Sequence, residues 1–158
     1  MIHPTAIIYP NVEIGKNVTI GAYCIIGAPA ESKAFWDKEG KGVVIMDNTI
    51  ITGHATIDAG TIVPTVIGKD CFIMKGVHIG HDAFICQGVT LSPHVVIGGH
   101  TEIGVHTNMG IGSVVHQRVS VPPLCMIGMN STITKKSKLL TKGVYVGSPA
   151  KFIRWNIR

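Results

Sequence analysis

The stretch from 76 to 85, GVHIGHDAFI, holds two closely spaced histidines, and the second, His81, is followed directly by Asp82. Two imidazoles at this spacing, His78 and His81, could bind a metal ion. An imidazole beside a carboxylate could instead be a general base, because the histidine pKa lies near the pH at which most enzymes work. The third interpretation is a pair of exposed polar residues without chemistry. The elements that carry these side chains decide among the three.

A six-residue repeat runs through this stretch. Every sixth residue from 67 to 133 is apolar, twelve of twelve positions in a chain that is 46% hydrophobic. A period of six does not fit an α-helix or a coiled coil, but it fits a solenoid with three short strands per turn, each pointing an aliphatic residue inward. The predicted fold is therefore all-β, a parallel β-helix with about 18 residues per coil.

Two interruptions break the repeat upstream. The step from Ile26 to Ile45 and the step from Ile57 to Ile67 are both longer than six, the first by far more than the second. Both segments carry the Gly and Pro residues typical of loops, so we expect protruding loops near 28–42 and 60–65. The repeat fades after 133. We therefore predict a β-helix over 1–143 and a capping segment over 144–158, in which Ser148-Pro149 should begin a helix.

One edge of the predicted coil collects histidines from three successive coils, about 5 Å apart: His81, His100 and His116. Both loops leave from this edge, whereas His78 faces outward from a strand. His94 and His106 fall on the other two edges, so a histidine ladder with a spacing of six cannot hold a metal ion within one chain. A histidine column beside Asp82, without a second carboxylate, suits proton abstraction by a neutral imidazole.

Charge is distributed unevenly. All nine acidic residues lie at or before Glu102, and residues 103–158 hold eight Lys and Arg. This third of the chain should attract anions. Nucleic acid is not the expected partner, because no run of basic residues alternates with aromatic ones. No signal peptide and no apolar run long enough to cross a bilayer is present, so we expect no membrane span and a cytoplasmic location. Four cysteines without paired spacing indicate reduced thiols, with Cys24, Cys71 and Cys125 pointing inward.

Three short motifs carry a family resemblance: HIGHD at 78–82, GGH at 98–100 and VVHQ at 114–117. With both loops, they resemble the hexapeptide-repeat acyltransferases and, more narrowly, the UDP-N-acetylglucosamine O-acyltransferases of lipid A biosynthesis. The resemblance implies a left-handed parallel β-helix that assembles as a homotrimer with active sites between subunits.

The resemblance also implies the reaction. An acyl or acetyl group would pass from a thioester of coenzyme A or acyl carrier protein directly to a hydroxyl or amine of a nucleotide sugar. No metal and no permanently bound cofactor is expected. His81 would be the general base supported by Asp82, and the N–H of Gly99 would stabilise the oxyanion.

Further residues would bind the two substrates. The residues lining the groove would be His78, His100, His116, Gln117 and Lys33. The GSPAK ending at 147–151 resembles that of coenzyme A-dependent sugar acetyltransferases. The cations expected to meet coenzyme A phosphates or an acidic carrier protein are Lys142, Lys151 and Arg154. The acceptor, the acyl length and the choice of donor stay open.

Two other function classes remain in view. A zinc enzyme resembling the γ-class carbonic anhydrases would share the β-helix and take histidine ligands from two subunits. A non-catalytic β-helix would serve as a scaffold or binding module.

Overall fold

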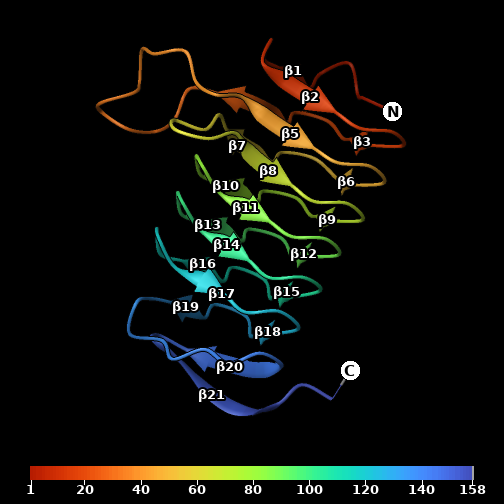
Figure 1. Cartoon of the computed structure of the whole chain (residues 1–158). Helices are drawn as coiled ribbons and strands as arrows, with labels where there is room; N and C mark the ends of the chain where they lie inside the picture. Colours follow the sequence, from red (N-terminus) through yellow and green to blue (C-terminus); the bar gives the residue numbers. More distant parts are fainter. Residues whose placement is uncertain (158) are drawn as a thin grey trace.

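A computed structural model describes residues 1–157 of the chain. The chain winds into a parallel β-helix with the two termini at opposite ends, and two loops project from one side near the N-terminal end (Figure 1). Three sheets form the faces of the coil, and their strands pair in parallel except for the last pair of the chain, which confirms the predicted fold class and agrees with a left-handed coil.

The strands are short and follow one another around the three faces. Sheet 1 contains β1 (Ile7–Ile8), β4 (Ile25–Ala28), β7 (Thr56–Asp58), β10 (His78–Ile79), β13 (Val96–Ile97), β16 (Val114–Val115) and β19 (Thr132–Ile133). Sheet 2 contains β2 (Val12–Ile14), β5 (Val43–Ile45), β8 (Thr65–Ile67), β11 (Phe84–Ile85), β14 (Glu102–Ile103) and β17 (Ser120–Val121). Sheet 3 contains β3 (Thr19–Ile20), β6 (Ile50–Ile51), β9 (Phe72–Ile73), β12 (Thr90–Leu91), β15 (Asn108–Met109), β18 (Met126–Ile127), β20 (Gly143–Gly147) and β21 (Ala150–Trp155).

Strand pairing confirms the predicted coil length. Ile79 pairs with Ile97, which lies one predicted coil further along the chain. Across the first loop Ile14 pairs with Ile45, a spacing of one coil plus the extra residues of that loop. Across the second loop Ile45 pairs with Ile67, a spacing of one coil plus the few extra residues of that loop. The extra residues therefore leave the coil as loops, and the register resumes unchanged.

The core is a stack of aliphatic side chains, because each two-residue strand points one residue inward and one outward. Ile79 is 0% exposed, whereas its strand neighbour His78 is partly exposed. The predicted inward cysteines Cys24, Cys71 and Cys125 are buried free thiols. Burial of a side chain the size of isoleucine contributes ~2 kcal/mol, so the repeat itself supplies the stability that holds the corners in place.

The C-terminal segment is a β-hairpin, and the predicted helix at Ser148-Pro149 is wrong. The Ser148-Pro149 peptide is cis and lies between β20 and β21, which pair antiparallel. The physical reason is that the repeat continues after a gap, since Tyr145 pairs with Ile127, one coil earlier in the chain, and is fully buried. Residues 1–157 contain no helix, and so none with the length and apolar character needed to cross a bilayer.

Candidate functional site

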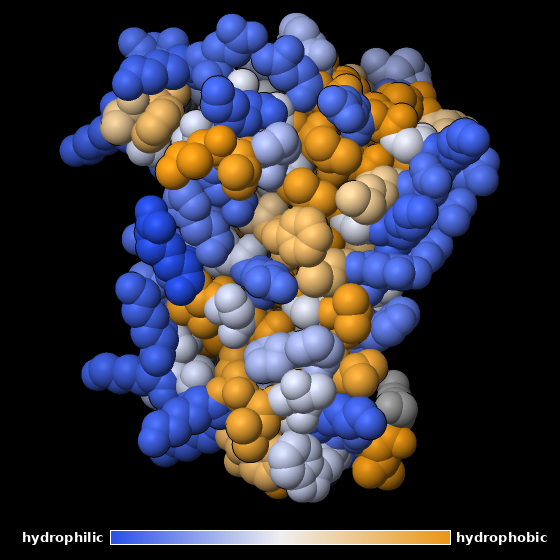
Figure 2. Space-filling view, in the orientation of Figure 1, coloured by the Kyte–Doolittle hydropathy of each residue, from blue (hydrophilic) through white to orange (hydrophobic). Residues whose placement is uncertain are grey.

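The loop corner is the edge of the coil where the chain passes from sheet 1 to sheet 2, and both loops leave from it (Figure 1). Residues with the same place in this corner recur once per coil below the loops. One column contains His81, Gly99, Gln117 and Lys135, and the next contains Asp82, His100, Arg118 and Lys136. Figure 2 shows hydrophilic residues gathered along this edge beneath the long loop.

His81 and Asp82 form the closest contact of the corner. His81 Nδ1 lies 2.7 Å from Asp82 Oδ2, and the Asp82 side chain is 0% exposed. An ionised carboxylate can only accept hydrogen bonds, so Nδ1 of His81 carries the proton and donates it. In the neutral ring this leaves Nε2 with a free lone pair. The pair therefore has the arrangement of a base and the carboxylate that orients it.

The second loop wraps around the Asp82 carboxylate. The N–H groups of Ile62 and Val63 donate to Oδ1 at 2.7 and 2.9 Å. The N–H and hydroxyl of Thr61 donate to Oδ2 at 2.9 and 2.7 Å. Burial acts to raise the pKa of Asp82, but these hydrogen bonds and the one from His81 outweigh it and hold the pKa well below its ordinary value. Asp82 is thus a fixed anion that ties the loop to His81.

Gly99 lies one coil below His81 and leaves space beside the reactive ring. A Cβ atom built on Gly99 would lie 2.9 Å from Cε1 and 2.9 Å from Nε2 of His81. The N–H of Gly99 donates to no acceptor within residues 1–157. A glycine at this position therefore lets the main chain come close to His81 Nε2 with a free N–H group.

His100 packs against the pair from the adjoining coil. Its ring lies 5.0 Å from that of His81, nearly perpendicular to it, and its Nε2 is 3.8 Å from Asp82 Oδ2. Partial burial lowers the pKa of His100. The Asp82 charge opposes this effect, and the nearby charges of Arg118 and His81 reinforce it. His100 is therefore favoured as a neutral hydrogen-bonding group.

His78 faces outward from β10, as expected, and belongs to a second polar group under the first loop. Its Nδ1 lies 2.8 Å from Thr56 Oγ1, and its Nε2 lies 3.9 Å from Asp58 Oδ2. Asp58 is 5% exposed, and burial raises its pKa above the ordinary value, although His78 opposes this. This histidine and carboxylate border the His81 site from the side of sheet 1.

The other expected groove residues lie at the same corner or on its loops. His116 bonds the carbonyl of Gln117 through Nδ1 at 3.0 Å and lines a cavity of about 470 Å³ with residues 134–136 and 148–149. His116 occupies the position of Gly98 in the register, and Arg118 follows His100 one coil further along. Lys33 lies on the first loop beside Trp36.

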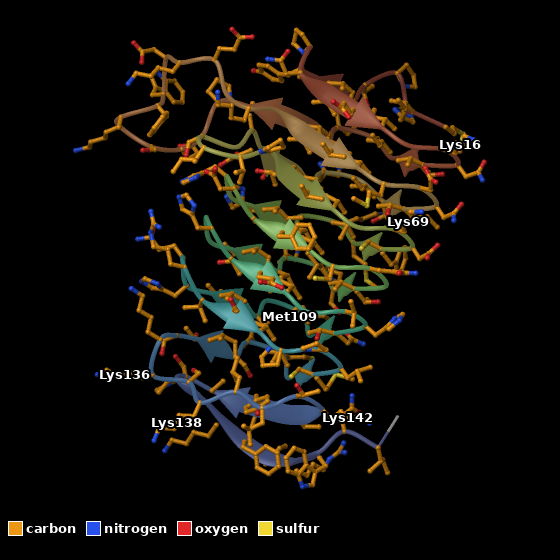
Figure 3. The ribbon with its side chains drawn as sticks, viewed as in Figure 1. Lys16, Lys69, Met109, Lys136, Lys138 and Lys142 are labelled. Carbon is orange, nitrogen blue, oxygen red and sulfur yellow. The ribbon has the colours of Figure 1, made fainter. Side chains whose placement is uncertain are left out.

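The three cations expected for the donor lie elsewhere in the chain. Lys142 is on the opposite side of the coil from Lys136 and Lys138 (Figure 3). Arg154 pairs with Val144 near the N-terminal end of β20, the end that Lys142 precedes. Lys151 pairs with Val146 near the C-terminal end of β20. Lys151 thus lies two residues beyond the turn at 148–149 that lines the His116 cavity, and the role of all three cations stays a prediction.

His81, Asp82 and His100 can each offer a ligand atom, and these atoms all lie within 4.8 Å of one another, as a metal site would require. The residues nevertheless do not fit a metal ion well. Asp82 Oδ1 already accepts two hydrogen bonds and Oδ2 three, and one of these engages His81 Nδ1. A metal ion would have to displace the loop that holds the carboxylate.

Three residues that the sequence analysis did not assign to a site belong to this region: Asp58, Thr61 and Arg118. The regular spacing from Asp82 through His100 leads directly to Arg118 and could have found it. No comparable signal marks Thr61, because its contact depends on the shape of an irregular loop.

The sequence of the chain is similar to one family of known proteins and to several individual relatives. The family model described as bacterial transferase hexapeptide (six repeats) matches residues 1–28 and 64–99. An acyl-acyl-carrier-protein–UDP-N-acetylglucosamine O-acyltransferase of Campylobacter concisus is 31% identical over 128 residues, covering 79% of this chain and 49% of the relative. Gamma carbonic anhydrase 2 of Arabidopsis thaliana mitochondria is 27% identical over 153 residues, covering 97% of this chain and 47% of the relative. The chain thus spans about half the length of these relatives.

Solved structures show the same fold. The UDP-N-acetylglucosamine O-acyltransferase of Moraxella catarrhalis superposes with a TM-score of 0.81 at 27% identity, covering 99% of this chain and 75% of that one. The chain thus has the six-residue repeat and the three-sided coil of a hexapeptide-repeat protein, and it is similar in sequence and fold to bacterial transferases of that type.

Proposed function

We propose that the protein transfers an acyl group from a thioester to a hydroxyl or amine of a nucleotide sugar. The observation that carries the proposal is the His81 ring, which Asp82 holds by Nδ1 while Nε2 lies where a Cβ atom on Gly99 would meet it. The N–H of Gly99 donates to no acceptor within residues 1–157, and acyl transfer uses a base together with such an oxyanion donor. The similarity to O-acyltransferases that act on UDP-N-acetylglucosamine supports the choice of acceptor.

The proposed reaction has two steps. His81 Nε2 takes the proton of the acceptor hydroxyl or amine as its oxygen or nitrogen attacks the thioester carbonyl carbon. The oxyanion that forms accepts a hydrogen bond from Gly99, a contribution worth ~3 kcal/mol in comparable sites. The carbon–sulfur bond then breaks, and the thiolate takes the proton back from His81. No covalent intermediate with the enzyme forms.

A homotrimer would complete the site. The His81 and His100 side chains are partly exposed in the single chain, and Lys142 lies on the opposite side of the coil from Lys136 (Figure 3). If a neighbouring subunit presents its C-terminal hairpin to the loop corner, Lys142, Lys151 or Arg154 can meet coenzyme A phosphates or an acidic carrier protein. His78, His116, Gln117 and Lys33 would line the groove for the acceptor.

Free thiol release tests the proposal. The purified protein is incubated with acetyl-coenzyme A, longer acyl donors and acyl carrier protein thioesters, each with a panel of nucleotide sugars. We expect thiol release that depends on both the donor and one acceptor class, and stabilisation by the same ligands in thermal unfolding. Failure of every pair to react or to stabilise the protein would contradict the proposal.

Replacing Gly99 by Ala should strongly impair transfer. The added methyl group meets the His81 ring at 2.9 Å, so the ring must move off its position. We expect kcat/KM to fall about 100-fold, because the base and the oxyanion donor are both displaced. Steady-state kinetics measure the effect, and thermal unfolding checks that the fold persists. A G99A variant with full activity would remove Gly99 from the oxyanion site.

A zinc-dependent hydration activity is the second candidate, favoured by the similarity to gamma carbonic anhydrase 2 and by the three ligand atoms within 4.8 Å. The hydrogen bonds that Asp82 accepts from the second loop argue against this activity, because a metal ion would have to displace them. Metal analysis of the purified protein separates the candidates, since stoichiometric zinc together with carbon dioxide hydration would favour the second.

A further inference from the structure

The lower part of the loop corner carries positive charge in a regular column. Asp82, His100, Arg118 and Lys136 occupy the same place on four successive coils. The first three share a left-handed backbone, with φ of 57°, 55° and 60°. The charge along the column thus changes from a carboxylate to an imidazole to two permanent cations.

Nothing within the described part of the chain neutralises these two cations. The Arg118 side chain makes no hydrogen bond or ion pair within residues 1–157. No acidic residue occurs anywhere in 103–158, and the nearest carboxylate of the column, Asp82, is fully engaged with the second loop. Two unpaired cations on neighbouring coils raise the local positive potential and attract an anion.

A cavity lies beside the column. Its volume is about 470 Å³, and it is lined by His116, Thr134, Lys135, Lys136 and the turn at 148–149. The Thr134 turn is braced internally, because the hydroxyl of Ser137 accepts from Thr134 N–H at 3.1 Å and the hydroxyl of Thr134 accepts from Lys136 N–H at 3.2 Å. Lys135 and Lys136 therefore project from an ordered turn, and Lys136 points away from the coil on the side of the loops (Figure 3).

We propose that Arg118, Lys136 and the adjoining cavity form a subsite for a phosphate group of the acceptor, two to three coils below His81. The inference rests on the proposed function, because it takes His81 as the point where the acceptor reacts. Arg118 supplies a planar, bidentate donor to phosphate oxygens, and Lys136 adds a point charge.

The distance from His81 to Arg118 fits a phosphate of the acceptor, and the titration described below separates this source from the donor. Coils are ~4.8 Å apart, so the main chain of Arg118 lies about 10 Å from that of Asp82. A sugar hydroxyl is about five bonds, or ~6 Å, from the phosphorus attached to the same sugar. The thioester sulfur of coenzyme A is about thirteen bonds, or on the order of 15 Å, from its first phosphorus. Along the coil axis the phosphorus of the acceptor is then about 4 Å from the main chain of Arg118, a distance that the long Arg118 side chain spans.

Calorimetric titration with UDP, uridine and coenzyme A tests the inference on the whole protein. In Arg118→Gln we expect the Kd for UDP to rise about tenfold, since one charge-assisted contact is lost. Uridine, which lacks phosphate, and coenzyme A should bind as to wild type. Lys136→Gln should also weaken UDP binding and gives a separate readout if the Arg118 variant folds poorly. Lys69→Gln, an exposed lysine on the opposite side of the coil, is the matched control (Figure 3).

The outcomes separate this inference from the proposed function. UDP that does not bind wild type, or binds both variants equally well, overturns the subsite. Weakened coenzyme A binding with unchanged UDP binding also overturns it, because the phosphate would then be the donor's. If UDP binding depends on Arg118 but no acyl transfer is found, the subsite stands and the proposed reaction fails. If transfer occurs with an unchanged acceptor KM in R118Q, the reaction stands and the subsite fails.

Discussion

His81→Asn is expected to reduce kcat/KM for acyl transfer about 1,000-fold while leaving the fold intact. A positioned general base contributes between 10² and 10⁴ in rate, and Asn cannot take a proton. The side chain is only partly buried and lies at the corner, so its loss leaves the aliphatic stack untouched. Steady-state kinetics give the rate, and circular dichroism and thermal unfolding report the fold.

His94→Asn is the matched control. His94 is an exposed histidine at a different corner, with φ of 61°, a conformation that Asn adopts readily. We expect its activity and melting temperature to stay close to wild type. Unchanged transfer in H81N would rule out His81 as the base, and equal losses in both variants would point to a general effect on the protein. A β-helix without catalysis would show no transfer in the wild type either.

Asp82→Asn is expected to affect both stability and activity. The carboxylate accepts four hydrogen bonds from Thr61, Ile62 and Val63, and an amide turns one acceptor oxygen into a donor facing those N–H groups. We expect a loss of about 3 kcal/mol in the free energy of unfolding, because buried donors lose a charged partner. We also expect at least a 100-fold loss of kcat, because the amide can donate to His81 Nδ1 and place the ring proton on Nε2.

The pH dependence of stability provides a second measurement on the same variant. The pKa of Asp82 is lowered in the folded protein, so its stabilisation is fully present above the ordinary Asp pKa of ~3.9 and is lost as pH falls through the folded value. Urea unfolding should therefore show a constant difference between wild type and D82N from pH 6 to 8, and a smaller one in strong acid. Asp37→Asn, an exposed carboxylate on the first loop, should show no such difference. If D82N were as stable as wild type at pH 7, the Asp82 carboxylate could not be what holds the second loop in place.

The repeat can be recognised in the sequence because each short strand buries its own aliphatic side chain, at a regular spacing along the chain. One aliphatic residue per six keeps water out of the coil, so Ile79, Ile97 and their equivalents indicate the strands and the coil length without any knowledge of contacts. The same register places His81 and His100 on one edge beneath both loops, and their rings do meet. The sequence analysis does not assign Tyr145 to the repeat, because irregular chain separates it from the last recognised strand. Tyr145 nevertheless lies one coil after Ile127 and pairs with it, so this segment continues the sheet and does not form a helix.

The sequence by itself determined the architecture and the corner at which chemistry can occur, because a six-residue apolar period admits few other folds. Only the tertiary structure decided how that corner is built. The second loop turns back and encloses Asp82 with three N–H groups, and the rings of His81 and His100 from neighbouring coils lie 5.0 Å apart, nearly perpendicular to each other. The physical reason is that these contacts join different coils through irregular backbone, whose path depends on hydrogen bonds and not on any pattern of apolar residues.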